Sequence, residues 1–386
     1  MGVPIYLDYN ATSPVDPRVR AAMLPFLGDQ FGNPSSTHAF GRFSWAALER
    51  ARRQVADLLG CASEEVIFTS GGSESDNLAI QGVAFANRAR GRHIVTSTVE
   101  HPAVINTCRY LAEQHGFDVT YVDVDHHGRV DPAAVIHAIR PETVLISIMQ
   151  ANNETGTIQP IAEIAGIARA AGVAFHSDAS QAVGKIPTRV ADLGVDLLTI
   201  AGHKLYAPKG IGALYVKGGV ELQPIIYGGG QERGLRAGTE NVPYAVALGE
   251  ACKVAAQVLP AEEGRQRALR DRLHEILADQ LGGVLLSGHP LERLPNTLNL
   301  SFQGVIGSDL LDEVPEIAFS TGSACHAGSA APSPVLAQMG LSTDVALGAV
   351  RLSIGRYTTE AEVDEAARHI LRGVRSLRRR SESPRE

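Results

Sequence analysis

A lysine and an aspartate, each placed where an apolar segment ends, are the side chains with the clearest chemical meaning in this chain. Asp178 closes the run 173–178, and Lys204 follows the run 195–200. Both runs have the length and composition of short strands. Sites in open α/β sheets lie outside such strand ends. A lysine there can form a Schiff base with the aldehyde of pyridoxal phosphate, and a carboxylate can keep its pyridine nitrogen protonated.

Each residue also has an ordinary interpretation, in which Asp178 caps the next helix and Lys204 is a solvated loop lysine. A nearby motif favours the cofactor. Gly72 and Ser73 follow a predicted strand at 66–69 and open a predicted helix, so they offer backbone N–H groups, a hydroxyl and a positive helix end to a phosphate. Alone, this turn is better explained as a tight turn capped by Ser73, and the phosphate role depends on the cofactor.

Two further side chains could act on a substrate. His101 lies at a predicted strand-to-helix junction, where an imidazole can stack on a pyridine ring and exchange protons near neutral pH. Cys325 lies in 320–334, a run of small and turn-forming residues that we expect to be mobile and to form no regular element. A cysteine on such a loop can reach and leave a site. We expect the other cysteines to be buried: Cys61, Cys108 and Cys252.

The elements that must position these residues alternate along the chain. Strand-like runs occur at 66–69, 93–98, 119–124, 144–149, 173–177, 197–200 and 213–216, with helix-like stretches between them. This alternation predicts an α/β fold with a mostly parallel seven-stranded sheet flanked by helices. A second region starts after Pro260 with an amphipathic helix that ends at Gly282 and Gly283. We therefore place a domain boundary near 258–262.

Composition narrows the functional classes. The chain has 386 residues, 44% hydrophobic and 20% charged, which is typical of a soluble globular protein. Its net charge of −7 gives no sign of nucleic acid or an anionic membrane surface. We find no leader and no apolar run of bilayer length, and we expect a cytoplasmic protein. The four cysteines show no Cys-x-x-Cys spacing, so neither disulfides nor a metal site is indicated.

Eight motifs in order give the chain a specific resemblance. It is similar to the NifS/IscS-type cysteine desulfurases, which belong to class V of the fold-type I pyridoxal phosphate enzymes, from Tyr6 to about Arg356. The motifs are 6–12 (YLDYNAT), 31–36 (FGNPSS), 68–75 (FTSGGSES), 100–102 (EHP), 151–156 (ANNETG), 228–233 (GGGQER), 238–241 (GTEN) and 351–355 (RLSIG).

The resemblance implies a complete pyridoxal 5′-phosphate site. Its residues would be Lys204 as the Schiff-base lysine, Asp178 as the pyridinium partner, Gln181 as a donor to the phenolic oxygen, His101 as the stacked acid/base, and Gly72, Ser73 and His203 around the phosphate.

It also implies a homodimer and a substrate site. Thr239 would reach the phosphate of the neighbouring subunit. Asn33, Asn153 and Arg351 would bind the amino acid, with Arg351 gripping the α-carboxylate in a bidentate manner. The implied domains are a large cofactor-binding domain at 15–258, and a small α+β domain made of 1–14 and 259–386, which carries the cysteine loop 320–334.

The activity implied is conversion of L-cysteine to L-alanine, with the sulfur left on Cys325 as a persulfide for an acceptor protein in iron–sulfur cluster assembly or tRNA thiolation. The nearest alternative is a selenocysteine lyase that acts on L-selenocysteine, which segments 200–204, 324–326 and 332–336 also resemble. A class V aminotransferase has no need of a loop cysteine. A catalytically idle scaffold protein has no need of Lys204, Asp178, His101, Arg351 and Cys325.

Two residues depart from the desulfurase pattern. Ala201 stands where a serine often adds a hydrogen bond to the phosphate, so we expect weaker or rearranged anchoring. His326 follows the loop cysteine where a small residue is usual. An imidazole there could help to deprotonate Cys325, and a solvated loop histidine is an equally good explanation.

Overall fold

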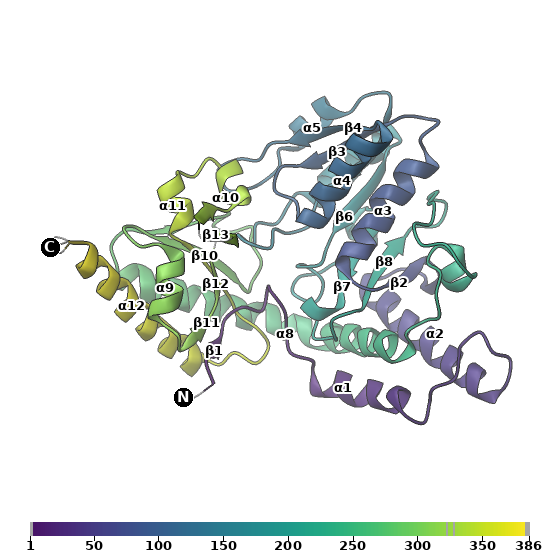
Figure 1. The fold of residues 1–386 in the computed structure, drawn as a ribbon, viewed down its shortest axis with the longest axis horizontal. Helices are drawn as coiled ribbons and strands as arrows, with labels where there is room; N and C mark the ends of the chain where they lie inside the picture. Colours follow the sequence, from purple (N-terminus) through teal and green to yellow (C-terminus); the bar gives the residue numbers. More distant parts are fainter. Residues whose placement is uncertain (1–2, 322, 327–328, 383–386) are drawn as a thin grey trace.

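The computed structural model describes residues 3–321, 323–326 and 329–382, with the backbone alone at 323–326, 329–331 and 382. Its main feature is the predicted seven-stranded sheet (Figure 1). In spatial order the strands are β2 (Val66–Thr69), β8 (Gly212–Val216), β7 (Leu197–Ala201), β6 (Ala174–Asp178), β5 (Thr143–Ser147), β3 (His93–Ser97) and β4 (Asp118–Val122).

The sheet is parallel from β7 to β4, and β8 runs antiparallel to both of its neighbours. Strands β2, β3, β5, β7 and β8 are buried at every position, as expected of strands covered on both faces. The predicted mostly parallel sheet is therefore confirmed. Because β2 is antiparallel to β8, it runs in the same direction as β7, and the two strands end at the same edge.

Helices cover both faces of this sheet. One apolar core holds α3 (Gly72–Ala86) and α4 (Pro102–His115) against the sheet. The other core holds α2 (Ala39–Leu59) and α6 (Ile161–Ala171) on the opposite face. Shorter elements complete this part: α1 (Pro17–Met23), α5 (Pro132–Ala138), α7 (Val190–Leu193), η1 (Leu24–Leu27), η2 (Ser63–Glu65), η3 (Gly202–Lys204) and η4 (Gln231–Gly234).

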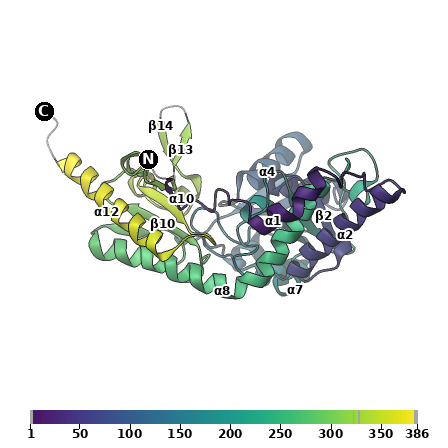
Figure 2. The same ribbon diagram turned by 90° about the horizontal axis from the view of Figure 1, so that it is seen from below.

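One long helix, α8 (Val242–Gln280), corrects the expectation that a helix starts after Pro260, because it runs through that proline. A proline inside a helix costs about 3 kcal/mol and bends it, and Figure 2 shows α8 bent along its length. The first half of α8 packs in the core against α2, and the second half buries Leu269, Leu273 and Leu277 in a separate core. The apolar packing of the two halves of α8 in two cores outweighs the free-energy cost of Pro260 inside the helix.

The same helix also corrects the expectation that the chain has no apolar run long enough to span a bilayer. By length and composition α8 could cross a membrane, with half of its apolar window buried inside the chain. Gly249 shows how close the packing is, since a Cβ there would lie 2.6 Å from Cα of Ala51 in α2. These contacts fit the core helix of a folded domain.

A second, smaller sheet has the order β12 (Ser320–Thr321), β15 (Ala349–Ser353), β10 (Thr297–Phe302), β9 (Val284–Leu286), all antiparallel. Strand β1 (Ile5–Tyr6) pairs with β11 (Ile317–Ala318), which places Leu7 in the core of this part. The accompanying helices are α9 (Gly307–Glu313), α10 (Pro334–Gln338), α11 (Thr343–Leu347) and α12 (Glu360–Glu382). The division of the chain at residue 258 stays a prediction.

The cysteine segment contains regular structure, contrary to expectation. Strand β13 (Ser323–His326) pairs with β14 (Ser329–Pro332) in an antiparallel hairpin, with Cys325 opposite Ala330. Small residues do not prevent such a ladder, because its hydrogen bonds come from the backbone alone. The Cys325 and His326 side chains, and residues 322, 327 and 328, lie outside the described part of the chain.

Candidate active site

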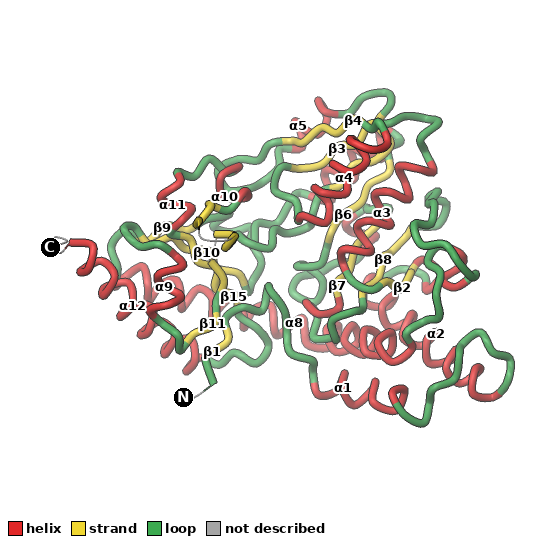
Figure 3. Tube along the Cα trace, viewed as in Figure 1, coloured by secondary structure: helices red, strands yellow, loops and turns green. Residues whose placement is uncertain are grey.

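Most of the predicted site residues line one cavity at the strand ends of the main sheet. Figure 3 shows the main sheet on one side of the molecule and the small sheet on the other. Asp178 is the last residue of β6, and Lys204 ends the η3 turn directly after the adjacent parallel strand β7. The same edge carries the end of β2, from which α3 begins at Gly72, and the segment from β3 to α4, which begins after His101. Residues far apart in the sequence therefore meet at neighbouring strand ends.

These strand ends surround a cavity of about 290 Å³. Its lining contains nine residues predicted from the sequence or its resemblance: Gly72, Ser73, His101, Asn153, Asp178, Gln181, His203, Lys204 and Arg351. Ala201, predicted as a departure from the pattern, also lines it. The sequence reasoning assigned no role to six others: Asn10, Ala11, Asp76, Met149, Ala151 and Ser180. Asn10 and Ala11 belong to the quoted 6–12 motif and Ala151 to the quoted 151–156 motif, so these motifs were the available signals.

Lys204 is held by the segment before α1. Its Nζ donates to the carbonyl of Asn10 and, at 2.8 Å, to that of Ala11. Burial lowers the pKa of Lys204 to about 8, and the Arg351 guanidinium acts in the same direction. A lysine with such a pKa exists in part as the neutral amine near neutral pH, which is the form that can accept a proton.

Asp178 is buried, and its Oδ1 accepts a hydrogen bond from the Ser180 backbone N–H at 2.8 Å. A turn follows it, with no helix for Asp178 to cap. Asp76 is buried next to it, and burial together with the Asp178 carboxylate raises the pKa of Asp76 well above its usual range. Burial therefore favours the protonated form of Asp76 beside the Asp178 carboxyl group.

Both predicted histidines are neutral in this setting. His101 is the N-cap of α4, where its Nδ1 accepts from the Ala103 N–H at 3.1 Å, and burial lowers its pKa. Burial and the nearby Lys204 lower the pKa of His203 to about 4. His203 Nδ1 lies 3.2 Å from Thr12 Oγ1. Neutral imidazoles here can each present one N–H donor and one acceptor.

The start of α3 forms a narrow recess in the cavity wall. A Cβ at Gly72 would lie 3.0 Å from Ser180 Oγ and 3.3 Å from the Ala201 Cβ, so only glycine leaves this space open. The first turn of this 15-residue helix presents free N–H groups and a positive dipole end. Ser73, Ser180 and His203 line the same cavity, so the recess suits a phosphate.

Arg351, on β15, approaches the cavity from the small sheet. Its guanidinium donates to Asp8 at 2.8 Å, to Ser320 Oγ at 2.9 Å and to the Asn153 carbonyl at 3.1 Å. Its Nε is buried without a hydrogen-bond partner among the described residues. An unsatisfied donor next to a cavity suits an anionic ligand such as a carboxylate.

Asn33 and Thr239 are not among the cavity-lining residues. Asn33 is exposed in the loop before α2, where its Oδ1 accepts from the Ser35 N–H, and Thr239 is exposed between η4 and α8. Their roles stay predictions. The described part of the cysteine loop joins the site at both ends, since Ser320 contacts Arg351 and Ser333 donates to Glu154, the neighbour of Asn153.

Comparison with known proteins identifies the class. Residues 5–366 match the family model "Aminotransferase class-V". The cysteine desulfurase IscS of Anaeromyxobacter dehalogenans is 48% identical over 384 residues, which cover 99% of this chain and 95% of that protein. The solved structure of a NifS-like protein has a TM-score of 0.90 at 38% identity, covering 96% of this chain and 99% of that one. SspA, solved in complex with cysteine, has a TM-score of 0.81 at 40% identity, covering 92% and 99%.

The chain thus belongs to the class V aminotransferase family of fold-type I enzymes. Within that family it is a member of the cysteine desulfurases, which use pyridoxal 5′-phosphate. The cavity fits this cofactor: it offers a lysine of lowered pKa, a buried carboxylate and a recess at a helix N-terminus. Among the described residues, no cluster of side chains could hold a metal ion.

Proposed function

We propose that this enzyme converts L-cysteine to L-alanine and keeps the sulfur on Cys325 as a persulfide. The observation that supports this most is the convergence of Lys204, Asp178, His101 and Arg351 around one cavity. The bound cofactor would supply an electron sink for the pair left on Cα when its proton is removed. Every other part of the chemistry is assigned to residues of the chain.

In the proposed reaction Arg351 and Asn153 orient the substrate through its α-carboxylate. Lys204 would anchor the cofactor and, as a neutral amine, take the proton from Cα of the substrate, while Asp178 would keep the cofactor's ring nitrogen protonated. His101 holds or supplies the proton at the substrate thiol. Gly72, Ser73, Ser180 and His203 would hold the phosphate, and Gln181 would donate to the ring oxygen.

Sulfur transfer then needs a nucleophile on the protein. The Cys325 thiolate attacks the substrate sulfur, so that an S–S bond forms while the Cβ–S bond breaks. The electron pair of the broken bond leaves with Cβ, and a proton completes the methyl group of alanine. No external oxidant is required. The persulfide is then available to an acceptor protein, such as a scaffold for iron–sulfur clusters or a carrier for tRNA thiolation.

The decisive variant is Cys325→Ser. It should eliminate alanine production from L-cysteine but leave a measurable reaction with L-selenocysteine, because the weaker C–Se bond can break without a protein nucleophile. Cys61→Ser, at a half-buried free cysteine, serves as the matched control and should behave as wild type. After one turnover with L-cysteine, mass spectrometry should find one added sulfur on the peptide that contains Cys325. Alanine production unchanged by Cys325→Ser, without that adduct, would refute the persulfide mechanism.

The same experiment separates the desulfurase from a selenocysteine lyase. Turnover restricted to L-selenocysteine in the wild-type enzyme would favour the lyase. Cysteine as the substrate is supported by SspA, a relative of 40% identity whose structure was solved in complex with cysteine.

We also propose a homodimer in the cytoplasm. The segment 24–45 exposes large apolar side chains that a monomer has little reason to display: Leu24, Leu27, Phe31, Phe40, Phe43 and Trp45. Thr239 is exposed, as a residue that serves a neighbouring subunit has to be before assembly. The three cysteines with described side chains are free thiols, which fits a reducing compartment. Light scattering after size-exclusion chromatography tests the mass of the dimer.

A further inference from the structure

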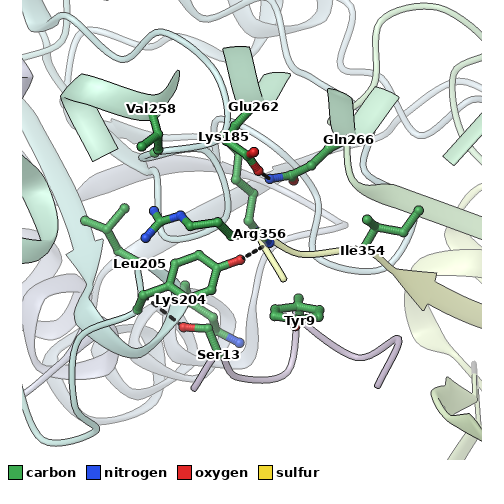
Figure 4. Close-up of a pocket in the computed structure, with 12 residues that line it drawn as sticks. Tyr9, Ser13, Lys185, Lys204, Leu205, Val258, Glu262, Gln266, Ile354 and Arg356 are labelled. Carbon is green, nitrogen blue, oxygen red and sulfur yellow. Dashed lines mark hydrogen bonds between the residues drawn. The ribbon is translucent and has the colours of Figure 1, made fainter. Parts of the chain in front are cut away.

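A second lysine lies beside the cavity, and the proposed mechanism does not use it. Lys185 is 9% exposed and lies in the turn segment after β6. Figure 4 shows it with Lys204, Tyr9 and Arg356 around a small cavity of about 10 Å³ between the two sheets. Its Nζ donates to Gln181 Oε1 at 2.8 Å and to Asn10 Oδ1 at 3.1 Å.

Ion pairing does not explain this buried amine. Its Nζ donates only to amide oxygens among the described residues, and Lys185 forms no ion pair within that part of the chain. The charges that act on it are cations, Lys204 and Arg351, which together with burial lower its pKa well below the usual range. A buried lysine without a carboxylate is costly to the fold. Its position therefore points to another role.

The hydrogen bonds determine how the Asn10 amide is oriented. Asn10 Nδ2 donates to the Asn153 carbonyl at 3.2 Å, and a carbonyl can only accept. The opposite atom, Oδ1, therefore faces Lys185 and also accepts from Asn296 Nδ2 at 2.9 Å. Lys185 must act as the donor in this contact. The amine is thus held in place by a residue whose own orientation is fixed.

Lys185 in turn orients Gln181, which lies four residues before it in the same turn segment. Because the amine donates, Gln181 turns Oε1 toward Lys185 and Nε2 away from it. Gln181 Nε2 donates to the Asn10 carbonyl at 3.0 Å, the same carbonyl that accepts from Lys204. Gln181 lines the cavity of about 290 Å³. Its N–H donor and the Lys204 amine are therefore held there by the same carbonyl group, that of Asn10.

We propose that Lys185 is a positioning residue, which holds the Gln181 amide with its N–H donor on the side of Lys204 and the cofactor. This inference depends on the proposed role of Gln181 as a donor to the cofactor's ring oxygen. Without Lys185, the amide would lose one of the two contacts that fix its orientation, the other being the Asn10 carbonyl. It could then turn its oxygen toward the ring oxygen, and these two acceptors would repel each other. The consequence should be weaker cofactor binding and altered ring electronics, with little change in the fold.

The test is a double-mutant cycle of Lys185→Met and Gln181→Leu. Methionine keeps the unbranched shape of lysine but donates no hydrogen bond. The readouts are the dissociation constant for pyridoxal 5′-phosphate, the absorbance maximum of the bound cofactor, and kcat/KM. Each single variant should bind the cofactor about tenfold more weakly and shift the absorbance maximum in the same direction. The double variant should be no worse than Gln181→Leu alone, because Lys185 acts through Gln181.

Lys253→Met, at an exposed lysine of α8 that lines neither cavity, is the matched control and should leave all three readouts unchanged. Thermal unfolding of the apoproteins measures the purely structural effect. A lowered Tm in Lys185→Met with normal absorbance and cofactor affinity would overturn the inference, as would additive effects in the double variant. A normal absorbance maximum in Gln181→Leu would overturn the proposed role of Gln181 and the inference with it. A defect in Gln181→Leu that Lys185→Met lacks would overturn the inference about Lys185 and leave the proposed role of Gln181 intact.

Discussion

At the scale of single residues, the cavity controls charge through burial. Lys204 has its pKa lowered from 10.5 to about 8, mainly because it is buried and close to Arg351. The neighbouring carboxyl of Asp76 has its pKa raised, so the cavity favours neutral forms of both kinds of group. In the same cavity Asp178 Oδ1 accepts a hydrogen bond from the Ser180 backbone N–H.

The lowered pKa of Lys204 predicts how the stability of the apoprotein depends on pH. Between pH 8 and 10.5 the unfolded chain holds a proton on Lys204 that the folded chain has lost, so folding stability rises with pH across this window. Relative to Lys204→Met, the wild-type apoprotein should gain roughly 1–3 kcal/mol between about pH 7 and about pH 10. Urea unfolding of both apoproteins measures this. A difference that does not change with pH would contradict the assigned shift.

Asp178→Asn tests the pyridinium partner. Asparagine can still accept the Ser180 N–H through its Oδ1, so the local turn and cofactor occupancy should be kept. A neutral amide no longer favours the protonated ring nitrogen, and kcat should fall about 100-fold or more. Solvent exchange of the Cα hydrogen of substrate should slow by the same factor. Near wild-type turnover at full occupancy would show that Asp178 has only a structural role.

At the scale of elements, local pattern predicted the main sheet well. The seven predicted strands all exist, and each boundary lies within two residues of the observed one. Short apolar runs between turn residues carry that information within a few positions. The helix through Pro260 could not be predicted in this way, because its stability comes from two cores that form only in the folded chain. The β13–β14 hairpin likewise depends on backbone pairing that small side chains do not reveal.

The recess at the start of α3, beside Ala201 of β7, allows a test of whether alanine at position 201 weakens the binding of the phosphate. The Ala201 Cβ would lie 3.3 Å from a Cβ on Gly72, so a hydroxyl at position 201 would face the helix N-terminus. Ala201→Ser should therefore add a hydrogen bond to the phosphate and tighten cofactor binding by about tenfold. Ser180→Ala, which removes a hydroxyl from the same recess, should weaken it. Equilibrium titration of the apoproteins measures both constants, and unchanged affinity in both variants would place the phosphate elsewhere.

At the scale of the whole molecule, Asn10 joins parts of the chain that are distant in sequence. It is 1% exposed, and its hydrogen bonds connect Lys185 beside the main sheet with Thr297 and Ser353 in the small one. The motif 6–12 was visible in the sequence, but the contacts it makes span up to 343 positions. The pattern of neighbouring residues in the sequence does not show contacts between residues so far apart. The family resemblance indicated that the 6–12 motif belongs to the site, and the structure shows which residues it contacts.

The proposed dimer predicts that inactive variants can restore each other. If Thr239 serves the neighbouring subunit, a heterodimer of Lys204→Ala and Thr239→Ala holds one site with Lys204 from one chain and Thr239 from the other. Random reassortment of equal amounts should make about a quarter of all sites wild type, since half of the dimers are mixed and each has one intact site. The measurement is turnover and cofactor occupancy after the two chains are co-refolded, compared with each variant refolded alone. If Thr239 acted within its own subunit, mixing would restore nothing beyond the average of the two separate variants, and the exposed position of Thr239 would need another explanation.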